Sequence, residues 1–458
     1  MTYRDALNFI YSFTNFEVTP ANTYSSKTFD LIRMERLLAA LDNPHTKFKS
    51  IHVAGTKGKG STSAIIESIL RAAGYSTGLY TSPHLHTFRE RIRADGKIIS
   101  QDDLVAGVEK IKPVVALVPD VTAFEVMTAL AFDYFAARGV AFAVLEVGLG
   151  GRLDATNVVT PVISVITSIS LDHMAILGDT LAQIASEKAG IIKPGIPVVS
   201  SPQKDEARIV VEQVAKKKNA PLAQISDFRF QISDLTFQIT PIASSLDGQT
   251  FQLSRLNLKP ETGNVQPVSC DLKLLGKHQL TNATTALATV SVLRANGIDI
   301  SDDAMRDGIS RVEWHGRFEI LSRSPFLILD GAHNADSARQ LVATLREFFP
   351  TAQLHFVFGV SSDKDIAGIF RELLPHAASL TLTRSHNPRA ADPGRLAELS
   401  PPYIVETVIQ PDLASAIESA IHRAEPTDVV CVTGSLFVVA QAREIWLTQQ
   451  GIQVEIDE

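Results

Sequence analysis

Short apolar runs alternate with amphipathic segments along most of this chain. A helical pattern at 124–138 places Phe124 and Phe135 on one face, and Thr122 and Glu125 have the spacing of a capping box. Buried strands that alternate with such helices predict an α/β fold with a parallel sheet covered on both faces. The predicted strands span 51–54, 78–81, 141–147, 162–168 and 196–200.

The pattern changes between about 226 and 275. Apolar and polar residues alternate there, as in the run 228–232, which predicts a small antiparallel β insertion. A helix at about 279–295 follows and ends at Gly297. We therefore predict one domain at 1–297 and a smaller α/β domain at 298–458, with a ligand cleft between them. The second domain has predicted strands at 326–330, 354–359, 378–383 and 428–433, and helices near 335–348, 364–374, 411–424 and 436–449.

Composition and charge narrow the class of protein. The 458 residues are 45% hydrophobic and 20% charged, with a net charge of −7, which argues against nucleic acid or an anionic membrane as partner. Only Cys270 and Cys431 occur, so a disulfide framework is excluded. No apolar stretch approaches the roughly 18 residues of a membrane span, and the first residues lack a secretory signal. We expect a cytoplasmic monomer that acts on small molecules.

The most informative segment is the glycine loop from Gly55 to Ser61, which follows the strand 51–54 and precedes a helical pattern at 62–73. A strand, a glycine loop and a helix in this order form an anion cradle, in which Lys59 would reach terminal phosphates. The loop departs from the common phosphate-loop pattern, because Gly60 separates Lys59 from Ser61. The alternative is a glycine-rich turn without a ligand.

Polar residues follow the other predicted strands, where ligands of parallel sheets gather. Glu146 ends the strand 141–147, and its carboxylate would suit the Mg²⁺ of a nucleotide; the alternative is a loop carboxylate. His173 follows the strand 162–168. Ser82 follows the strand 78–81, and its hydroxyl would bind the metal; the alternative is a simple turn signal. Spacing alone favours a structural or surface histidine at His173. Lys188 lies at the end of a predicted helix, and this position alone favours a surface charge that offsets the helix dipole.

The second domain has its own candidates. Asp330 ends a strand, and His333 lies at the start of the next helix, where ribose or phosphate contacts are expected. Arg317 stands near the beginning of this domain and is suited to clamp phosphates. For the segment 363–365, a helix cap is as good an interpretation as a role in the site.

Together these motifs resemble the folylpolyglutamate synthase and dihydrofolate synthase family of the Mur ligase superfamily. The resemblance covers nearly the whole chain, and the run from Leu145 to Asn157 is its most specific part. It implies an N-terminal parallel-sheet domain with a phosphate loop, of the Mur ligase central-domain type, and a smaller Rossmann-like C-terminal domain. The matching segments are 55–61, 81–85, 145–157, 172–173, 187–190, 315–318 and 330–334.

The family resemblance also implies a reaction. The γ-phosphoryl group of ATP passes to a carboxylate of dihydropteroate or tetrahydrofolate, and the amine of L-glutamate then displaces phosphate from the acyl phosphate. We predict both the dihydrofolate synthase and the folylpolyglutamate synthase activity. The alternatives are folylpolyglutamate synthase alone, a P-loop ATPase or kinase, or a nucleotide-binding protein without catalysis.

Residue roles follow from the same resemblance. Lys59, His173, Lys188 and Arg317 would be catalytic, and two Mg²⁺ ions would be held by Ser82 and Glu146 and by His173 and a carbamylated Lys188. The ATP contacts would be Gly58, Lys59, Gly60, Ser61, Asn282, Arg317, Asp330 and His333. The pterin-side contacts would be Asp30, Leu31, Thr122, Ala123, Phe124, Glu125, Leu153, Asp154 and Ala155. The chain departs from the family pattern at Lys57, where asparagine is usual, and at Ala335, where proline is frequent.

Overall fold

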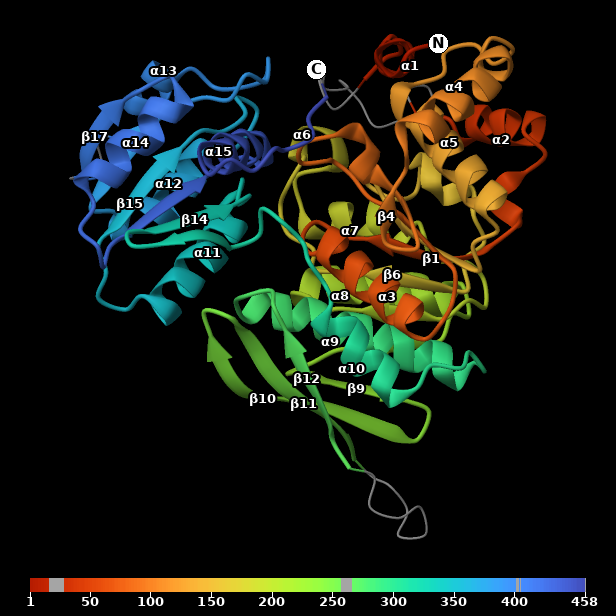
Figure 1. Ribbon diagram of the computed structural model, residues 1–458. Coiled ribbons are helices and arrows are strands. Elements are labelled where there is room, and N and C mark those ends of the chain that lie inside the picture. The colour runs from red at the N-terminus through yellow and green to blue at the C-terminus, as the bar shows by residue number, and fades with distance from the viewer. Residues whose placement is uncertain (16–28, 257–265, 401–402, 404, 458) are drawn as a thin grey trace.

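The computed structural model describes residues 1–15, 29–256, 266–400, 403 and 405–457, which form three sheets (Figure 1). The first has the strand order β4-β3-β2-β5-β1-β6-β7-β8, the second β12-β11-β10-β9, and the third β13-β14-β18-β15-β16-β17. The predicted α/β class, with parallel sheets and a small antiparallel insertion, is confirmed.

The first sheet is parallel at its centre. β1 lies between β5 and β6, and all five predicted strands are present, whereas the short strands β3, β4 and β8 were not predicted. β3 runs antiparallel to β2 and β4 at one edge. The strands are β1 (Lys49–Ala54), β2 (Thr77–Tyr80), β3 (Ile92–Ala94), β4 (Lys97–Ile98), β5 (Phe142–Glu146), β6 (Ile163–Ile166), β7 (Val198–Ser200) and β8 (Leu222–Gln224).

Helices cover both faces of this sheet because alternate strand residues point to opposite sides. Val144 of β5 packs with the core around α3, whereas Ala143 and Leu145 pack with α5. The capping box of Thr122 and Glu125 begins α5 as predicted. The helices are α1 (Tyr3–Tyr11), α2 (Leu31–Ala40), α3 (Lys59–Ala72), α4 (Gln101–Val115), α5 (Ala123–Arg138), α6 (Met174–Leu177), α7 (Leu181–Ala189), α8 (Asp205–Lys217), α9 (Lys277–Ala295) and α10 (Asp302–Ser310); the short 3-10 turns are η1 (Pro44–Thr46), η2 (Phe88–Arg91) and η3 (Ala155–Val158).

The antiparallel insertion packs on α9 and α10 at the bottom of the view in Figure 1. In β12 Val268, Cys270 and Leu272 are buried while the residues between them are exposed, which is the alternation of a one-sided sheet. The strands are β9 (Arg229–Ile232), β10 (Leu235–Ser245), β11 (Gly248–Leu256) and β12 (Val268–Leu272).

The third sheet forms the second α/β unit. Its four predicted strands are parallel. The two edge strands were not predicted: β13 is antiparallel to β14, and β17 is parallel to β16. The strands are β13 (Glu319–Arg323), β14 (Phe326–Asp330), β15 (Leu354–Phe358), β16 (Ser379–Leu382), β17 (Glu406–Ile409) and β18 (Val429–Thr433). The helices are α11 (Ala335–Phe348), α12 (Ile366–Leu373), α13 (Pro393–Glu398), α14 (Leu413–Arg423) and α15 (Leu436–Gln449), with the 3-10 turn η5 (Leu374–His376).

The helix α10 follows the predicted domain boundary at Gly297 but packs on α3. The Ser68 hydroxyl donates to the Gly308 carbonyl at 2.7 Å, and a Cβ on Gly308 would lie 2.4 Å from the Ile69 Cα. We therefore propose a boundary between Val312 and Phe318, so that the first domain includes α10.

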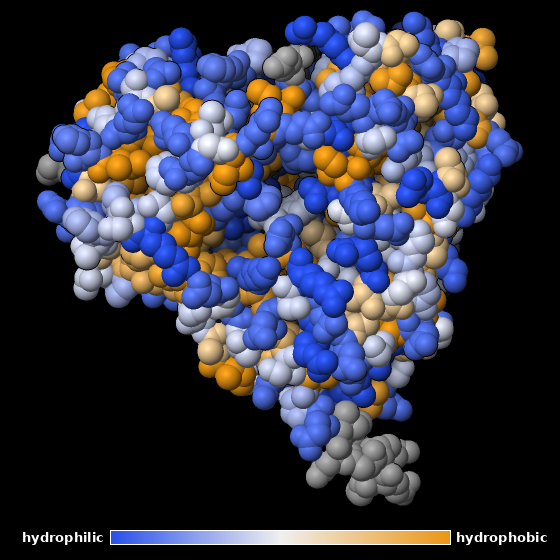
Figure 2. Space-filling model, in the orientation of Figure 1, coloured by the Kyte–Doolittle hydropathy of each residue, from blue (hydrophilic) through white to orange (hydrophobic). Residues whose placement is uncertain are grey.

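The two domains also meet near the chain ends, which lie close together in Figure 1. The Asp457 carboxylate accepts hydrogen bonds from the Tyr3 hydroxyl at 2.6 Å and the Thr87 hydroxyl at 2.7 Å. Figure 2 shows hydrophilic residues over most of this face, and a hollow between the domains that is bordered by both hydrophilic and hydrophobic residues. None of the helices in the described part of the chain combines the length and the apolar character needed to cross a bilayer.

Candidate functional site

The glycine loop lies between β1 and α3 at the carboxyl edge of the first sheet. The backbone N–H groups of Thr56 and Lys57 donate to the Ser168 carbonyl at 2.9 and 3.1 Å, which fixes the loop against the segment that follows β6. Gly58 caps α3 with a φ of +81°, a conformation that strains any residue with a side chain. The loop therefore has the strand, turn and helix start of an anion cradle.

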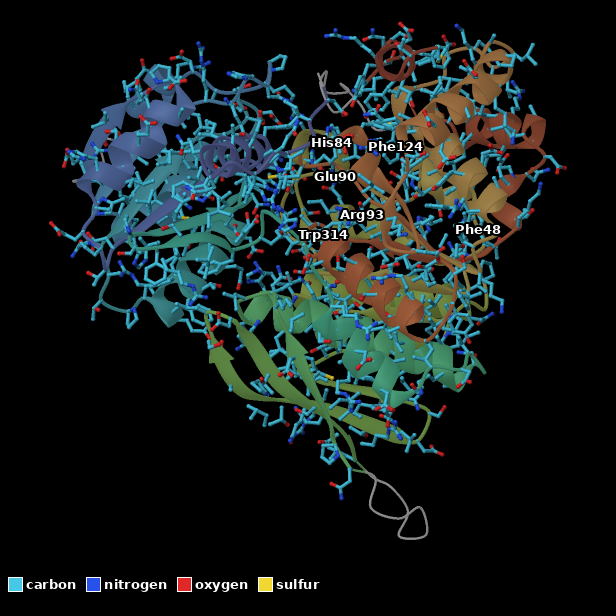
Figure 3. The ribbon with its side chains drawn as sticks, in the orientation of Figure 1. Phe48, His84, Glu90, Arg93, Phe124 and Trp314 are labelled. Atoms are coloured by element: carbon cyan, nitrogen blue, oxygen red, sulfur yellow. The ribbon has the colours of Figure 1, made fainter. Side chains whose placement is uncertain are left out.

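Two elements from later in the chain close on this loop. A Cβ on Gly58 would lie 2.2 Å from the Asn282 Oδ1 on α9, and a Cβ on Gly60 would lie 3.0 Å from the Trp314 ring. The Arg93 guanidinium in turn lies 5.6 Å from the centre of the Trp314 ring, and Figure 3 shows these two side chains together beside α3. Gly58 is therefore favoured by a close contact as well as by its backbone conformation, and Gly60 by a close contact alone.

Glu146 and Ser82 meet at the ends of β5 and β2. The Ser82 backbone N–H donates to Glu146 Oε2 at 3.2 Å, and Lys59 Nζ lies 3.6 Å from Glu146 Oε1. Burial raises the pKa of Glu146, although Lys59 and Arg317 oppose this effect. One carboxylate and one hydroxyl are the oxygen donors that Mg²⁺ takes when water and phosphate complete its shell, so this pair fits a nucleotide-bound Mg²⁺.

Lys188 is buried, with 5% of its side chain exposed. Its Nζ donates to the Gly55 carbonyl at 2.9 Å, which brings the end of α7 to the glycine loop. Burial and the neighbouring Lys59 lower the pKa of Lys188 to about 7. The alternative of a surface charge at a helix end is therefore wrong.

His173 lies at the edge of the site. It begins α6 with a φ of +50°, and its side chain remains 39% exposed. Its Nε2 is 4.0 Å from Asp172 Oδ1, and Lys188 and Lys364 act on it electrostatically. Within the described residues, no three His, Cys, Asp or Glu side chains gather as a metal cluster. A metal at His173 would need the modified Lys188 and phosphate oxygens as further ligands.

The second domain faces this group with Arg317, Asp330 and His333. Arg317 is close enough to Glu146 and Asp330 that both carboxylates act on its pKa, which burial lowers. The Asp330 carboxylate accepts the backbone N–H groups of Phe318 and Ala332, both at 2.9 Å, so it also holds the two loops together. His333 Nε2 lies 2.9 Å from Lys57 Nζ. The predicted second-domain residues thus converge on the glycine loop.

Three residues without a predicted site role join this group. Asp172 pairs with Lys57 within the first domain and with Lys364 across the junction of the domains. In the segment 363–365 only Asp365 caps a helix, since its carboxylate accepts the Gly368 N–H at 2.9 Å, whereas Asp363 pairs with Arg389. The sequence offered one signal for two of these residues, namely that Lys57 and Asp172 stand beside predicted site residues.

The predicted pterin-side residues come together at the starts of α2 and α5. Asp30 caps α2 through the Ile32 N–H at 2.9 Å, and Arg33 Nε donates to Glu125 at 3.2 Å. A Cβ on Gly148 would lie 2.5 Å from the Phe124 ring, so α5 also touches the loop that follows β5. These contacts build a continuous wall next to Glu146.

Asp154 in that loop has internal partners. Its carboxylate accepts the N–H groups of Leu149 at 2.9 Å and Thr156 at 3.0 Å, and it lies 2.5 Å from the Thr156 hydroxyl. These bonds shape the loop that carries Leu153 and Ala155. A direct substrate contact of Asp154 stays a prediction.

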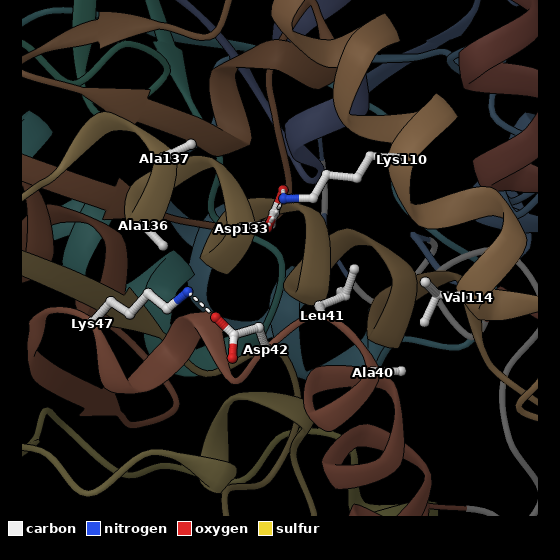
Figure 4. Close-up of a pocket in the computed structure, with 9 residues that line it drawn as sticks. All are labelled: Ala40, Leu41, Asp42, Lys47, Lys110, Val114, Asp133, Ala136 and Ala137. Atoms are coloured by element: carbon white, nitrogen blue, oxygen red, sulfur yellow. Dashed lines mark hydrogen bonds and ion pairs between the residues drawn. The ribbon is translucent and has the colours of Figure 1, made fainter.

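A separate cavity of about 490 Å³ lies away from this site (Figure 4). It is at the C-terminal ends of α2 and α5, whereas the pterin-side residues are at their N-terminal ends. Its charges are paired within the cavity wall, Lys47 with Asp42 at 2.7 Å and Lys110 with Asp133 at 2.6 Å. It provides no free charged group for a ligand.

Comparison with known families gives two matches. Residues 53–290 match the Mur ligase middle domain, and residues 316–436 match the Mur ligase glutamate ligase domain.

Individual relatives match over nearly the whole chain. The Bacillus subtilis protein named dihydrofolate synthase/folylpolyglutamate synthase is 35% identical over 96% of this chain and 98% of its own length. A Haloferax volcanii protein named "Probable bifunctional folylpolyglutamate synthase/dihydropteroate synthase" is 37% identical over 97% of this chain, and the chain spans 51% of that relative. The solved structure of Mycobacterium tuberculosis folylpolyglutamate synthase complexed with ADP superposes with a TM-score of 0.84 at 32% identity, covering 97% of this chain and 98% of that one.

Proposed function

Because this chain belongs to the folylpolyglutamate synthase and dihydrofolate synthase family of Mur ligases, we propose that it joins L-glutamate to folate-type carboxylates with ATP. It is a ligase that forms carbon–nitrogen bonds. The proposal includes both acceptors, dihydropteroate and tetrahydrofolate, as in the name of the Bacillus subtilis relative.

The observation that carries the proposal is the convergence of charges at the glycine loop. Lys59 and Lys188 reach it from the first domain, and Arg317 faces Glu146 from the second. A binding site for a triphosphate between two domains explains why these cations are gathered there. A carboxylate at the same place supplies the metal ligand that a nucleotide requires.

The proposed reaction has two steps. An oxygen of the acceptor carboxylate attacks the γ-phosphorus of ATP, the bond to the β-phosphate oxygen breaks, and ADP leaves. The glutamate amine then attacks the acyl carbon, loses a proton, and the acyl carbon–oxygen bond breaks to release phosphate. Because transferred phosphoryl groups carry high charge, positioned cations provide much of the rate in such reactions.

This chain's own cations are suited to both steps. Lys59 would contact the terminal phosphates, and Arg317 would approach from the second domain as charge develops. Asn282, which packs against Gly58, would contact the adenine side of the nucleotide, and Asp330 would contact ribose. Closure of the domains would also exclude water, which otherwise hydrolyses an acyl phosphate.

Magnesium is implied by the family, and the donor set fits it. Ser82 and Glu146 would hold one ion, and His173 with a carbamylated Lys188 would hold a second. Bound Mg²⁺ supplies charge neutralisation on the phosphates.

Carbamylation of Lys188 is supported by its surroundings. Its neutral amine would add to CO₂ with loss of a proton, so a cation becomes an anion. Lys59 and Lys57 both act on Lys188 electrostatically, and an anion at this position would remove their repulsion. A carbamate oxygen is also a ligand that Mg²⁺ prefers.

The wall formed by α2, α5 and the loop after β5 is the proposed acceptor site. It lies beside Glu146, and it holds the predicted contacts from Asp30 to Ala155. The test is a glutamate-ligation assay with dihydropteroate and tetrahydrofolate side by side. Ligation with tetrahydrofolate alone would limit the enzyme to folylpolyglutamate synthesis, and phosphate release without glutamate would favour an ATPase.

A further inference from the structure

Asp172 is the meeting point of three loops from two domains. It follows β6 in the first domain, and 7% of its side chain is exposed. Lys57 of the glycine loop donates to its Oδ2 at 3.1 Å. From the second domain, Lys364 donates to its Oδ1 at 2.9 Å and Asn334 donates to its Oδ2 at 3.1 Å. One carboxylate thus joins the glycine loop to the starts of α11 and α12.

Lys57 makes a second contact across the same junction. His333 Nδ1 lies 2.8 Å from the Gly331 carbonyl, which only accepts, so Nδ1 carries the ring proton. In a neutral ring Nε2 then has a lone pair, and it faces Lys57 Nζ at 2.9 Å. The 3.6 Å between His333 Nε2 and Asp172 is too long for a hydrogen bond, so Lys57 is the link between them.

These contacts connect the two domains directly beside the glycine loop. Lys57, Asp172, Asn334, His333 and Lys364 therefore make a clasp that holds the second domain against the glycine loop. The Lys57–Asp172 pair lies within the first domain, whereas Lys364 and Asn334 reach Asp172 from the second, so the whole clasp exists only in the closed arrangement.

We propose that Lys57 and Asp172 are positioning residues, which hold the second domain closed and orient His333 for the nucleotide phosphates. The inference rests on the proposed function, in which ATP is bound between the domains. It assigns to Lys57 an action through Asp172 and His333 instead of a direct bond to ATP.

The clasp has a specific kinetic consequence. When the competent state is only partly populated, the apparent dissociation constant rises in proportion to the lost fraction. ATP contacts both domains and restores closure at saturation, so a broken clasp raises KM for ATP and leaves kcat nearly unchanged. A residue whose only role is structural would lower the melting temperature without this split.

The experiment compares Lys57→Asn, Lys57→Arg, Asp172→Asn and the Lys57→Asn/Asp172→Asn double variant in the full-length protein. Calorimetric ATP binding and glutamate-dependent phosphate release are both measured. We expect Lys57→Asn and Asp172→Asn each to raise the apparent Kd and KM for ATP about tenfold, as for loss of a charged hydrogen bond. The double variant should be no more than about threefold worse than either single variant, because the two residues act as one unit. Lys57→Arg should restore most of the affinity.

The decisive comparison is Asp172→Asn. If Lys57 bound ATP directly, removal of its carboxylate partner would release it and strengthen ATP binding, and that result would overturn the proposal. An unchanged KM in Lys57→Asn or multiplicative effects in the double variant would overturn it as well. Lys364→Gln breaks the clasp from the other domain and replaces Asp172→Asn if that variant does not fold.

Lys47→Asn is the matched control, because Lys47 is an exposed lysine that pairs with Asp42 far from the loop. It should leave ATP binding unchanged. Failure of the proposed function is a different result from failure of the clasp: the unaltered protein would bind ATP but release no phosphate in response to glutamate. Calorimetry still tests the clasp in that case.

Discussion

Lys59 Nζ lies 3.6 Å from Glu146 Oε1, so the cation of the glycine loop faces the carboxylate at the end of β5. The side chains are 17% and 5% exposed. Each group partly neutralises the other. In the proposed reaction Lys59 would leave Glu146 to contact phosphate, and Glu146 would instead hold Mg²⁺. This pair is therefore central to the proposed reaction.

Glu146→Gln should separate activity from stability. Burial raises the pKa of Glu146, so its charge costs folding energy, and the neutral amide removes that cost. We expect a melting temperature within about 3 °C of the original or above it, and turnover reduced by about 100-fold with a higher requirement for Mg²⁺. Thermal unfolding and a magnesium titration of phosphate release measure the two effects. Glu109→Gln, at an exposed carboxylate, is the control; equal turnover in both variants would remove Glu146 from the site.

Gly58→Ala should abolish ATP binding, whereas Gly74→Ala should not. Both glycines have positive φ, +81° and +88°, so the backbone strain of about 1 kcal/mol is similar. Only at Gly58 does the added Cβ meet another group, Asn282 Oδ1 at 2.2 Å, and open space surrounds Gly74. Calorimetry with ATP and denaturant unfolding of both variants distinguish the two contributions. Similar ATP affinities would show that the contact with Asn282 is unimportant.

Carbamylation of Lys188 should increase with pH through the neutral range. The pKa of Lys188 is lowered from 10.5 to about 7, so the neutral amine that captures CO₂ predominates above about pH 7 and disappears below it. We expect a carbamate signal in ¹³C NMR with labelled CO₂ that grows from about pH 6 to about pH 8. Lys188→Ala should lack this signal and be inactive. An active enzyme whose Lys188 stays unmodified in the presence of CO₂ would disprove the carbamate.

The same lowered pKa has a consequence for folding. In the unfolded chain Lys188 binds a proton up to about pH 10.5, whereas in the folded protein it releases that proton near pH 7. The unfolded state therefore binds more protons between these values, so the free-energy cost of burying this group grows as the pH falls from about 10.5 to about 7. In the absence of CO₂, Lys188→Met should flatten the rise in unfolding free energy between about pH 7 and about pH 9. Parallel curves for the two proteins would contradict the assignment.

Arg317→Ala should act on catalysis rather than on folding of the second domain. Arg317 lies beside Asp330 and Glu146 at the junction, and a cation there would stabilise charge during phosphoryl transfer. We expect kcat to fall by about 100-fold or more, with partial recovery in Arg317→Lys, which keeps the charge without the planar fork. Arg323→Ala, at an exposed arginine paired with Asp247, is the control for phosphate-release kinetics. A change in KM alone would assign Arg317 to binding.

The sequence predicted the central strands because parallel strands are buried on both faces and become continuous apolar runs. β1, β5, β14 and β18 are of this kind. The missed strands lie at or near sheet edges: β4 has two residues, and β17 is half-exposed, so neither leaves a clear hydrophobic pattern.

The same contrast holds for the site. The proximity of Glu146 and Ser82 was predictable, because each follows an apolar strand and the carboxyl ends of parallel strands share one edge. The surface-charge interpretation of Lys188 failed because local sequence does not reveal burial by a distant loop. The pairing of Asp172 with Lys57 and Lys364 was not predictable beyond the position of Lys57 and Asp172 beside predicted site residues, since it depends on how distant loops and the two domains come together.

The most direct test of the proposed ligase activity is a single assay of ATP turnover with purified protein, in which glutamate and the pterin acceptor are each omitted in turn. Phosphate release and the mass of the pterin product are recorded together. We expect phosphate release only when ATP, acceptor and glutamate are all present, with one glutamate added to the acceptor for each phosphate released. Phosphate release that is indifferent to glutamate, with an acceptor of unchanged mass, would contradict it.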